Sequence, residues 1–381
     1  MALARGRGFA DAFGPAEGPT AHLLPIPPLI AGGVYSLLGV QSAPAEAVLL
    51  AWSLLLTFAT YAFFAMVVRR LGASPGTSVA AFCFLCVAPV FTTAEAFDFR
   101  VWDGAITMAT AGAFLILLLR ADAGEAMHPI MRGLLSALPA LLLFLQPIIG
   151  LAACVAWAQW LLRQRRAKAL LATVTPFLFL LALLFGGWTA RNMAAMGEPI
   201  WLRDNVGLEL AVANHDAAVA PVDPGAVFQA RLKQVHPLNG AGAYRAMEAA
   251  GGEIAYARKL GAETRSWMAA HPADAARIWM RHLREIMLPA PWQFRTANGH
   301  ILPIVRAILV DITTMAGLAG LALLLRDRRR QALYLAPFIV LPILAYMPFQ
   351  PILRYIWLIY APLTCLAAYM IERTLMFVRR R

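Results

Sequence analysis

Long apolar runs dominate this sequence, and they restrict what the chain can fold into more than any other feature. A helix needs about 20 consecutive, mostly apolar residues to cross the hydrocarbon core of a bilayer. Several runs of about this length follow one another along the chain, in which 60% of the residues are hydrophobic and 14% are charged. A soluble domain is roughly one quarter charged. We therefore predict an all-α fold, a polytopic helical membrane bundle.

The apolar runs predict about nine spans. Seven of the spans are single runs, at 46–68, 76–95, 104–120, 169–188, 301–325, 332–349 and 354–374. The run 132–163 is too long for one span, and Gln146-Pro147 interrupts it. We divide it into two short spans, 132–145 and 149–163, joined by a tight turn. Residues 25–42 are apolar but open with three prolines, and we expect a helix that lies on the external membrane surface.

The basic residues predict which loops are cytoplasmic. Sixteen of the 33 lie around residues 69–70, 120–132, 163–168, 326–330 and 373–381, whereas the short turns on the other side carry only Arg100 and Arg354. Cytoplasmic loops carry the excess of Lys and Arg. The two basic ends of the run 132–163 share a side only if that run is two spans. The N-terminus as given is then external, and the C-terminus is cytoplasmic.

This topology divides the chain into four parts. They are an external loop with the interfacial helix (1–45), the first six spans (46–189), an external loop domain (190–300) and the last three spans (301–381). In the loop domain we expect ordered loop to about residue 240, then helix to Leu288 with a break at His271-Pro272. The last of these helices is amphipathic and is expected to lie on a membrane surface.

Several functional classes lack support in the sequence. It contains no Walker-A loop, HExxH, GxSxG or GxGxxG motif, so ATP-driven transport, zinc proteolysis and serine hydrolysis are not indicated. The four cysteines all lie in apolar runs, and they imply no disulfide framework. The net charge of +12 is explained by the basic cytoplasmic loops, and no nucleic-acid motif accompanies it.

Polar side chains gather on the predicted external face in four segments: the N-terminal loop, the turn 95–103, the segment 191–215 and the turn 350–355. Acids and arginines that converge at a membrane face can bind a phosphate-bearing lipid headgroup and perform acid/base chemistry. The alternative is that they are solvated loop residues. For Asp103, which follows Trp102 at the entrance of a span, the alternative is an N-cap or first-turn residue.

Three groups of motifs carry a family resemblance. The first holds Ala4-Arg5-Gly-Arg-Gly-Phe9, Asp11-Ala-Phe-Gly14, Gly18-Pro-Thr-Ala-His22, Pro27-Pro-Leu29 and Leu37-Leu-Gly39; the second holds Trp188-Thr-Ala-Arg-Asn192, Arg203-Asp-Asn-Val-Gly-Leu-Glu-Leu210 and Ala213-Asn214; the third is Arg354-Tyr355 followed by Pro362. Their order resembles the first external loop, the post-span segment and the C-terminal span of bacterial C-type membrane glycosyltransferases. These enzymes are the relatives of protein mannosyltransferases and lipid A aminoarabinose transferases.

The resemblance implies a transferase of the bacterial inner membrane that moves a sugar, with inversion, from a polyprenyl-phosphate donor to a cell-envelope acceptor. It implies an acid of the first external loop as general base, for which Asp11 is a substitute, and a supporting acid, matched by Asp103 or Asp98. Arg354 and Tyr355 would lie near the donor phosphate. Further candidate substrate-binding residues are His22, Arg100, Arg191, Asn192, Asn205, Glu209 and Asn214. No cofactor is indicated with certainty, and a divalent cation is the one candidate.

The chain departs from the family in one respect. There, a span and an aspartate precede the Gly-Arg-Gly-Phe segment, whereas this sequence begins at Met1, after that point. We expect either a start further upstream or a truncated, inactive copy, because loss of a general base costs about 10²–10⁴-fold in rate. The alternatives to a glycosyltransferase are a non-enzymatic membrane transporter or envelope-assembly scaffold, and a polymerase or ligase of surface polysaccharide.

Overall fold

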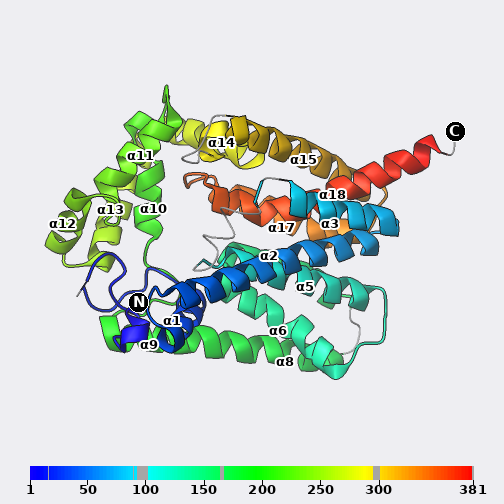
Figure 1. Cartoon of the computed structure of the whole chain (residues 1–381), viewed down its shortest axis with the longest axis horizontal. Coiled ribbons are helices and arrows are strands. Elements are labelled where there is room, and N and C mark those ends of the chain that lie inside the picture. Colours follow the sequence, from blue (N-terminus) through cyan, green and yellow to red (C-terminus); the bar gives the residue numbers. More distant parts are fainter. Residues whose placement is uncertain (16, 89, 92–101, 164–166, 295–300, 380–381) are drawn as a thin grey trace. The chain divides into compact units, whose positions relative to one another are not determined.

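The described part of the chain is mainly helical. The computed structural model describes residues 1–381 except 16, 89, 92–101, 164–166, 295–300 and 380–381 (Figure 1). Helices account for 76% of the chain, and the described part contains no β-strand. Its one isolated β-bridge pairs Ala10 with Pro19. The prediction of an all-α fold is confirmed.

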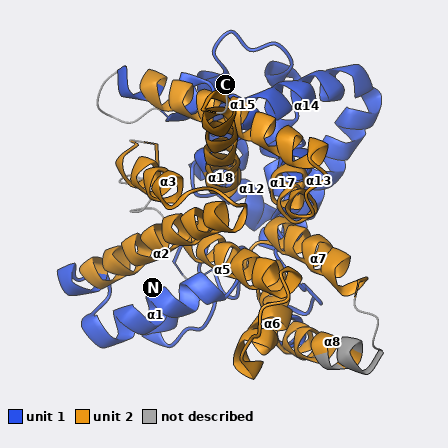
Figure 2. Ribbon diagram, turned by 90° about the vertical axis from the view of Figure 1, so that its right-hand side faces the viewer, with its two compact units in different colours: residues 1–45, 185–303, 343–353 blue, residues 46–184, 304–342, 354–381 orange. Residues whose placement is uncertain are grey.

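The chain forms two compact units, each assembled from separate stretches of sequence (Figure 2). Unit 1 comprises residues 1–45, 185–303 and 343–353, and unit 2 comprises residues 46–184, 304–342 and 354–381. The segment 343–353, which sequence reasoning placed with the last spans, thus belongs to unit 1.

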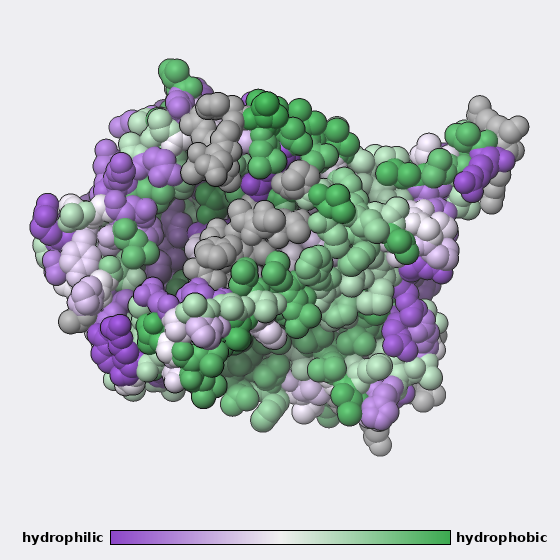
Figure 3. Space-filling model, viewed as in Figure 1, coloured by the Kyte–Doolittle hydropathy of each residue, from purple (hydrophilic) through white to green (hydrophobic). Residues whose placement is uncertain are grey.

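Unit 2 consists mainly of apolar helices. Its helices are α2 (Ala43–Arg70), α3 (Pro75–Val87), α5 (Gly104–Asp122), α6 (Pro129–Leu145), α7 (Pro147–Leu161), α8 (Ala167–Leu181), α15 (Ile301–Arg326), α16 (Gln331–Leu335), α17 (Pro337–Tyr346) and α18 (Leu353–Val378). Within the described residues, five helices are long and apolar enough to cross a membrane: α2, α5, Thr173–Met196, α15 and α18. Apolar side chains also cover much of their exposed surface (Figure 3). These features indicate a membrane protein.

The predicted break at Gln146-Pro147 is present. Helix α6 ends at Leu145 and α7 begins at Pro147, with Gln146 in an extended conformation between them. Just beyond α7, Arg163 donates hydrogen bonds to Asp122 at the end of α5 (3.2 Å) and to the hydroxyl of Tyr334 (2.6 Å). The basic ends of the run 132–163 therefore lie at one end of unit 2, as two antiparallel helices require.

Unit 1 contains more helix than its composition predicts. Its helices are α1 (Ile26–Leu38), α9 (Gly187–Met196), α10 (Val206–Ala213), α11 (Pro224–Val235), α12 (Ala241–Ala249), α13 (Glu253–Ala270) and α14 (Pro272–Met287). Helices α10 and α11 correct the prediction of ordered loop before residue 240. Helix α11 has a local start signal, because the Asp223 side chain accepts from Ala226 N at 3.0 Å and Pro224 occupies the first turn.

The breaks between α12, α13 and α14 follow local signals. Gly251 and Gly252 have φ of 91° and 108°, a region that favours glycine, and they separate α12 from α13. The predicted break at His271-Pro272 is also present. In α14, however, Ile278 and Ile286 are buried. The face that was expected to meet lipid is instead covered by protein.

A small hydrophobic core holds unit 1 together where α10 crosses α13. Leu208, Val212 and Leu260 are buried there with residues of α11 and α12. The two helices approach each other so closely that only glycine fits at position 207. A Cβ there would overlap with the carbonyl oxygen of Ala257 and would lie 3.0 Å from the Cα of Gly261. This crossing fixes the segments that carry the candidate site of unit 1.

Candidate functional site

The first candidate site lies in unit 2, where α5 and α18 begin. Trp357 Nε1 donates to the carbonyl of Gly104 at 3.0 Å and joins the first turns of the two helices. Beside this bond, the Arg354 guanidinium lies over the Trp102 ring, 3.4 Å from its centroid. A guanidinium stacked in this way keeps N–H donors directed outward in its plane.

Arg354 has the chemistry of an anion receptor. Its guanidinium stacks on Trp102 and makes no hydrogen bond or ion pair with another described residue. A guanidinium carries five donors in a planar fork that matches a phosphate or a carboxylate. Tyr355, the next residue, is half-buried. The corner can therefore bind an anionic group at the end of two apolar helices.

Asp103 occupies the N-cap position of α5. Its backbone carbonyl accepts from Thr107 N at 2.9 Å, but its side chain makes no capping hydrogen bond. Asp103 therefore lies at the N-cap position that the structural alternative predicts, although its carboxylate does not cap the helix. Asp98 and Arg100, the other candidates of this turn, lie outside the described residues.

The N-terminal loop of unit 1 is closed upon itself. Asp11 N donates to Gly18 O, and Thr20 N donates to Phe9 O, both at 3.0 Å. Asp11 has a φ of 61°, a left-handed conformation that aspartate tolerates better than most residues. Its carboxylate forms an ion pair with Arg7 and accepts from Gly18 N at 3.3 Å. Asp11 is thus part of the loop's own framework, with its side chain only 8% exposed.

Arg191 of α9 contacts both sides of this loop. Its guanidinium donates to the carbonyl of Thr20 at 2.8 Å and to that of Phe9. It also lies 5.3 Å from the ring centroid of Phe9 and 5.2 Å from that of Trp188. The structure therefore gives this predicted substrate-binding residue a clear positioning role.

The predicted amide residues make internal hydrogen bonds. Buried Asn192 accepts from Arg191 and donates to the carbonyl of Ile200 at 2.7 Å. Asn205, just before α10, donates to Glu209 at 3.4 Å.

Asn214 is buried and connects three segments of unit 1. It donates to Leu210 O at 2.9 Å and to Pro348 O at 2.8 Å, and it accepts from Trp279 Nε1 at 2.9 Å. These bonds connect α10 and α14 to the segment 343–353.

Two acids that sequence reasoning did not select form the second candidate site. Asp204 precedes α10, Glu253 is the first residue of α13, and their carboxyl groups contact each other. Burial, reinforced by the charge of Glu253, raises the pKa of Asp204 to about 8. A carboxyl group that changes charge near neutral pH is a candidate acid or base. The sequence gives only a weak indication of this site, because Asp204 appears in it solely as a member of the Arg203–Leu210 motif.

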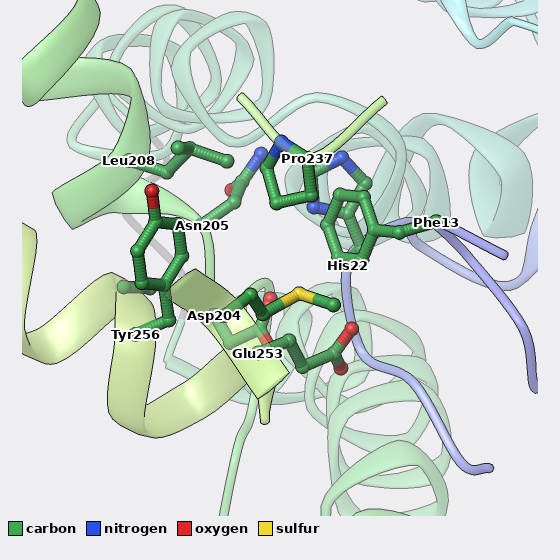
Figure 4. A pocket seen from close by; sticks show the side chains of 10 residues that line it. Phe13, His22, Asp204, Asn205, Leu208, Pro237, Glu253 and Tyr256 are labelled. Atoms are coloured by element: carbon green, nitrogen blue, oxygen red, sulfur yellow. The ribbon is translucent and has the colours of Figure 1, made fainter. Parts of the chain in front are cut away.

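Asp204 and Glu253 lie on one wall of a small cavity, with Phe13 and His22 on another (Figure 4). His22 is buried, and its ring packs against Phe13 with 4.7 Å between the ring centroids. The cavity measures about 10 Å³, close to the space that one water molecule needs. It is too small for a sugar in this conformation.

In the described ranges, no group of three or more His, Cys, Asp or Glu side chains could hold a metal ion. No family model matches the chain, and neither a curated protein nor a solved structure is significantly similar to it.

Proposed function

We propose that this chain is a C-type membrane glycosyltransferase that transfers a sugar from a polyprenyl-phosphate donor to a cell-envelope acceptor. The observation that carries the proposal is the Arg354 guanidinium, stacked on Trp102 with no acceptor among the described residues. It lies where two apolar helices begin, which is where a lipid-linked phosphate would meet a membrane protein. Asp103 directly follows Trp102 and is the acid that we assign to activate the acceptor.

Unit 1 gives independent support. The N-terminal loop and Trp188–Asn192 of α9 resemble the family as separate motifs. Hydrogen bonds from Arg191 to Phe9 and Thr20, and from Thr20 to Glu253, join the loop to α9 and α13.

The binding test compares Arg354 variants of the full chain in nanodiscs, with a polyprenyl monophosphate as the probe. We expect Arg354→Ala to weaken binding by roughly 10- to 100-fold, the effect of losing hydrogen bonds from a charged group. Arg354→Lys keeps the charge but loses the planar fork, so its affinity should be intermediate. Arg373→Ala is the matched control, because Arg373 pairs with Asp327 at the opposite end of α18.

The same preparations test Asp103. If Asp103 activates the acceptor, Asp103→Asn should bind the probe normally but lose sugar transfer by about 10²–10⁴-fold. Unchanged probe binding in Arg354→Ala would refute the phosphate site. Full transfer activity in Asp103→Asn would refute only the assignment of the base.

The proposal includes a topology of about nine spans in a bacterial inner membrane, with residues 190–300 periplasmic. We expect an impermeant thiol reagent to label Val222→Cys in intact cells and Arg328→Cys only after permeabilisation, in a background without the four native cysteines. Both positions are exposed. The opposite pattern of labelling would show that the chain has the reverse orientation, and it would contradict the proposed site of sugar transfer.

A further inference from the structure

The acid pair of unit 1 holds the end of the N-terminal loop. The Glu253 carboxylate accepts from Thr20 Oγ1 at 2.7 Å and from the backbone N–H of Ala21 at 2.8 Å. Both residues precede His22, whose ring lines the adjoining cavity. Residues 20–22 are therefore held to the start of α13 through a single carboxylate.

The contact between Asp204 and Glu253 requires a proton. Asp204 Oδ2 is buried and finds no donor among the described residues. Its neighbour is the carboxyl group of Glu253, which already accepts two hydrogen bonds from the loop. Two carboxylate oxygens cannot satisfy each other unless one of them is protonated. The geometry therefore places a proton on Asp204, which then donates toward Glu253.

Other charged and titratable groups also lie around the pair. Arg191 of α9 interacts electrostatically with Glu253. The remaining groups are Arg203 beside Asp204, Tyr256 on α13, His22 on the cavity wall and His236 against the His22 ring. Loss of the proton from Asp204 would place two negative charges side by side in a poorly solvated site.

We propose that Asp204 and Glu253 form a proton-dependent clasp, whose hold on residues 20–22 is strongest in acid and weakens as the pH rises to mildly alkaline values. The clasp concerns the loop alone, and the proposal does not depend on which substrate the protein takes.

The direction of the pH effect follows from linkage. Burial is the main reason that the pKa of Asp204 is raised from 3.8 to about 8 in the folded protein. When the clasp opens, Asp204 meets solvent and regains its ordinary pKa. The closed form therefore binds one more proton than the open form between these two values. The stability that this proton gives to the closed form is complete below pH 3.8. It is lost as the pH rises from 3.8 to about 8, and there is no further change above about 8.

The test is hydrogen exchange at the Ala21 amide of the full chain in nanodiscs, corrected for the intrinsic pH dependence of exchange. We expect protection to fall by up to about tenfold per pH unit from pH 5 to pH 8 and then to level off. Asp204→Asn keeps a donor but cannot ionise, so its protection should be independent of pH. Asp274→Asn replaces a half-buried acid of α14 that pairs with Arg277, and it should retain the wild-type profile.

Two results would overturn the clasp: a flat wild-type profile, or an Asp204→Asn profile with the wild-type slope. Glu253→Gln provides a second measurement if Asp204→Asn does not fold. It removes the charge beside Asp204 but leaves the burial, so the plateau should begin at a lower pH. An unchanged plateau in Glu253→Gln would also contradict the proposal.

Discussion

Gly207→Ala is expected to destabilise unit 1 strongly. The added Cβ would overlap with the carbonyl oxygen of Ala257 and would press on Gly261, and both obstacles are backbone rather than flexible side chain. Helices α10 and α13 would have to separate, and the core around Leu208 and Leu260 would open. We expect a loss of roughly 3 kcal/mol or more, at the upper end of overpacking costs.

Thermal or denaturant unfolding of the purified protein, followed by hydrogen exchange in α10 and α13, measures this effect. Gly242→Ala is the matched control, because Gly242 lies in helix α12 of the same unit with open space around its added Cβ. Alanine is the better helix former, so the control should be neutral or slightly stabilised. Equal stability of the two variants would show that α10 and α13 do not cross as closely as described.

The features of the fold that sequence reasoning predicted are those with local causes. Long apolar runs predict membrane helices because lipid needs only a continuous apolar surface. The breaks at Pro147 and Pro272 follow from the effect of proline on its own and the preceding residue. Helix α10 was missed because its stability comes from packing on α13, which allows Gly207 to lie in a helix despite its poor propensity. For α11, the Asp223-Pro224 signal was available and was outweighed by composition.

The candidate site was predictable by residue type but not by role. Asp103 was selected for its position at the entrance of a span and Arg354 through the family resemblance, and they lie where α5 and α18 begin. Asp204 and Glu253 are far apart in the sequence, and only the crossing of α10 and α13 brings them together. A local pattern cannot encode such a contact, because it depends on tertiary packing and on burial that the sequence does not display.

Arg191 shows the same distinction, and it yields the second large prediction. Sequence reasoning selected it as a substrate ligand, whereas its guanidinium donates to the carbonyls of Phe9 and Thr20. Arg191→Ala should free the loop from residue 9 to residue 20 and leave the crossing of α10 and α13 intact. Hydrogen bonds from a charged group contribute about 1.5–3 kcal/mol each. We expect the Asp11 and Thr20 amides to exchange roughly 10²-fold faster, since 1.4 kcal/mol corresponds to a factor of ten.

Two variants distinguish a positioning role from a general loss of charge. Arg258→Ala removes an exposed arginine that pairs with Glu198 at 2.9 Å, and it should leave loop exchange unchanged because solvent screens that pair. Arg191→Lys keeps the charge but cannot bridge both carbonyls with one planar group, so its exchange rates should be intermediate. If Arg191→Ala leaves the Thr20 amide fully protected, the loop is held by the Glu253 contacts alone, and Arg191 becomes available as a ligand for the donor.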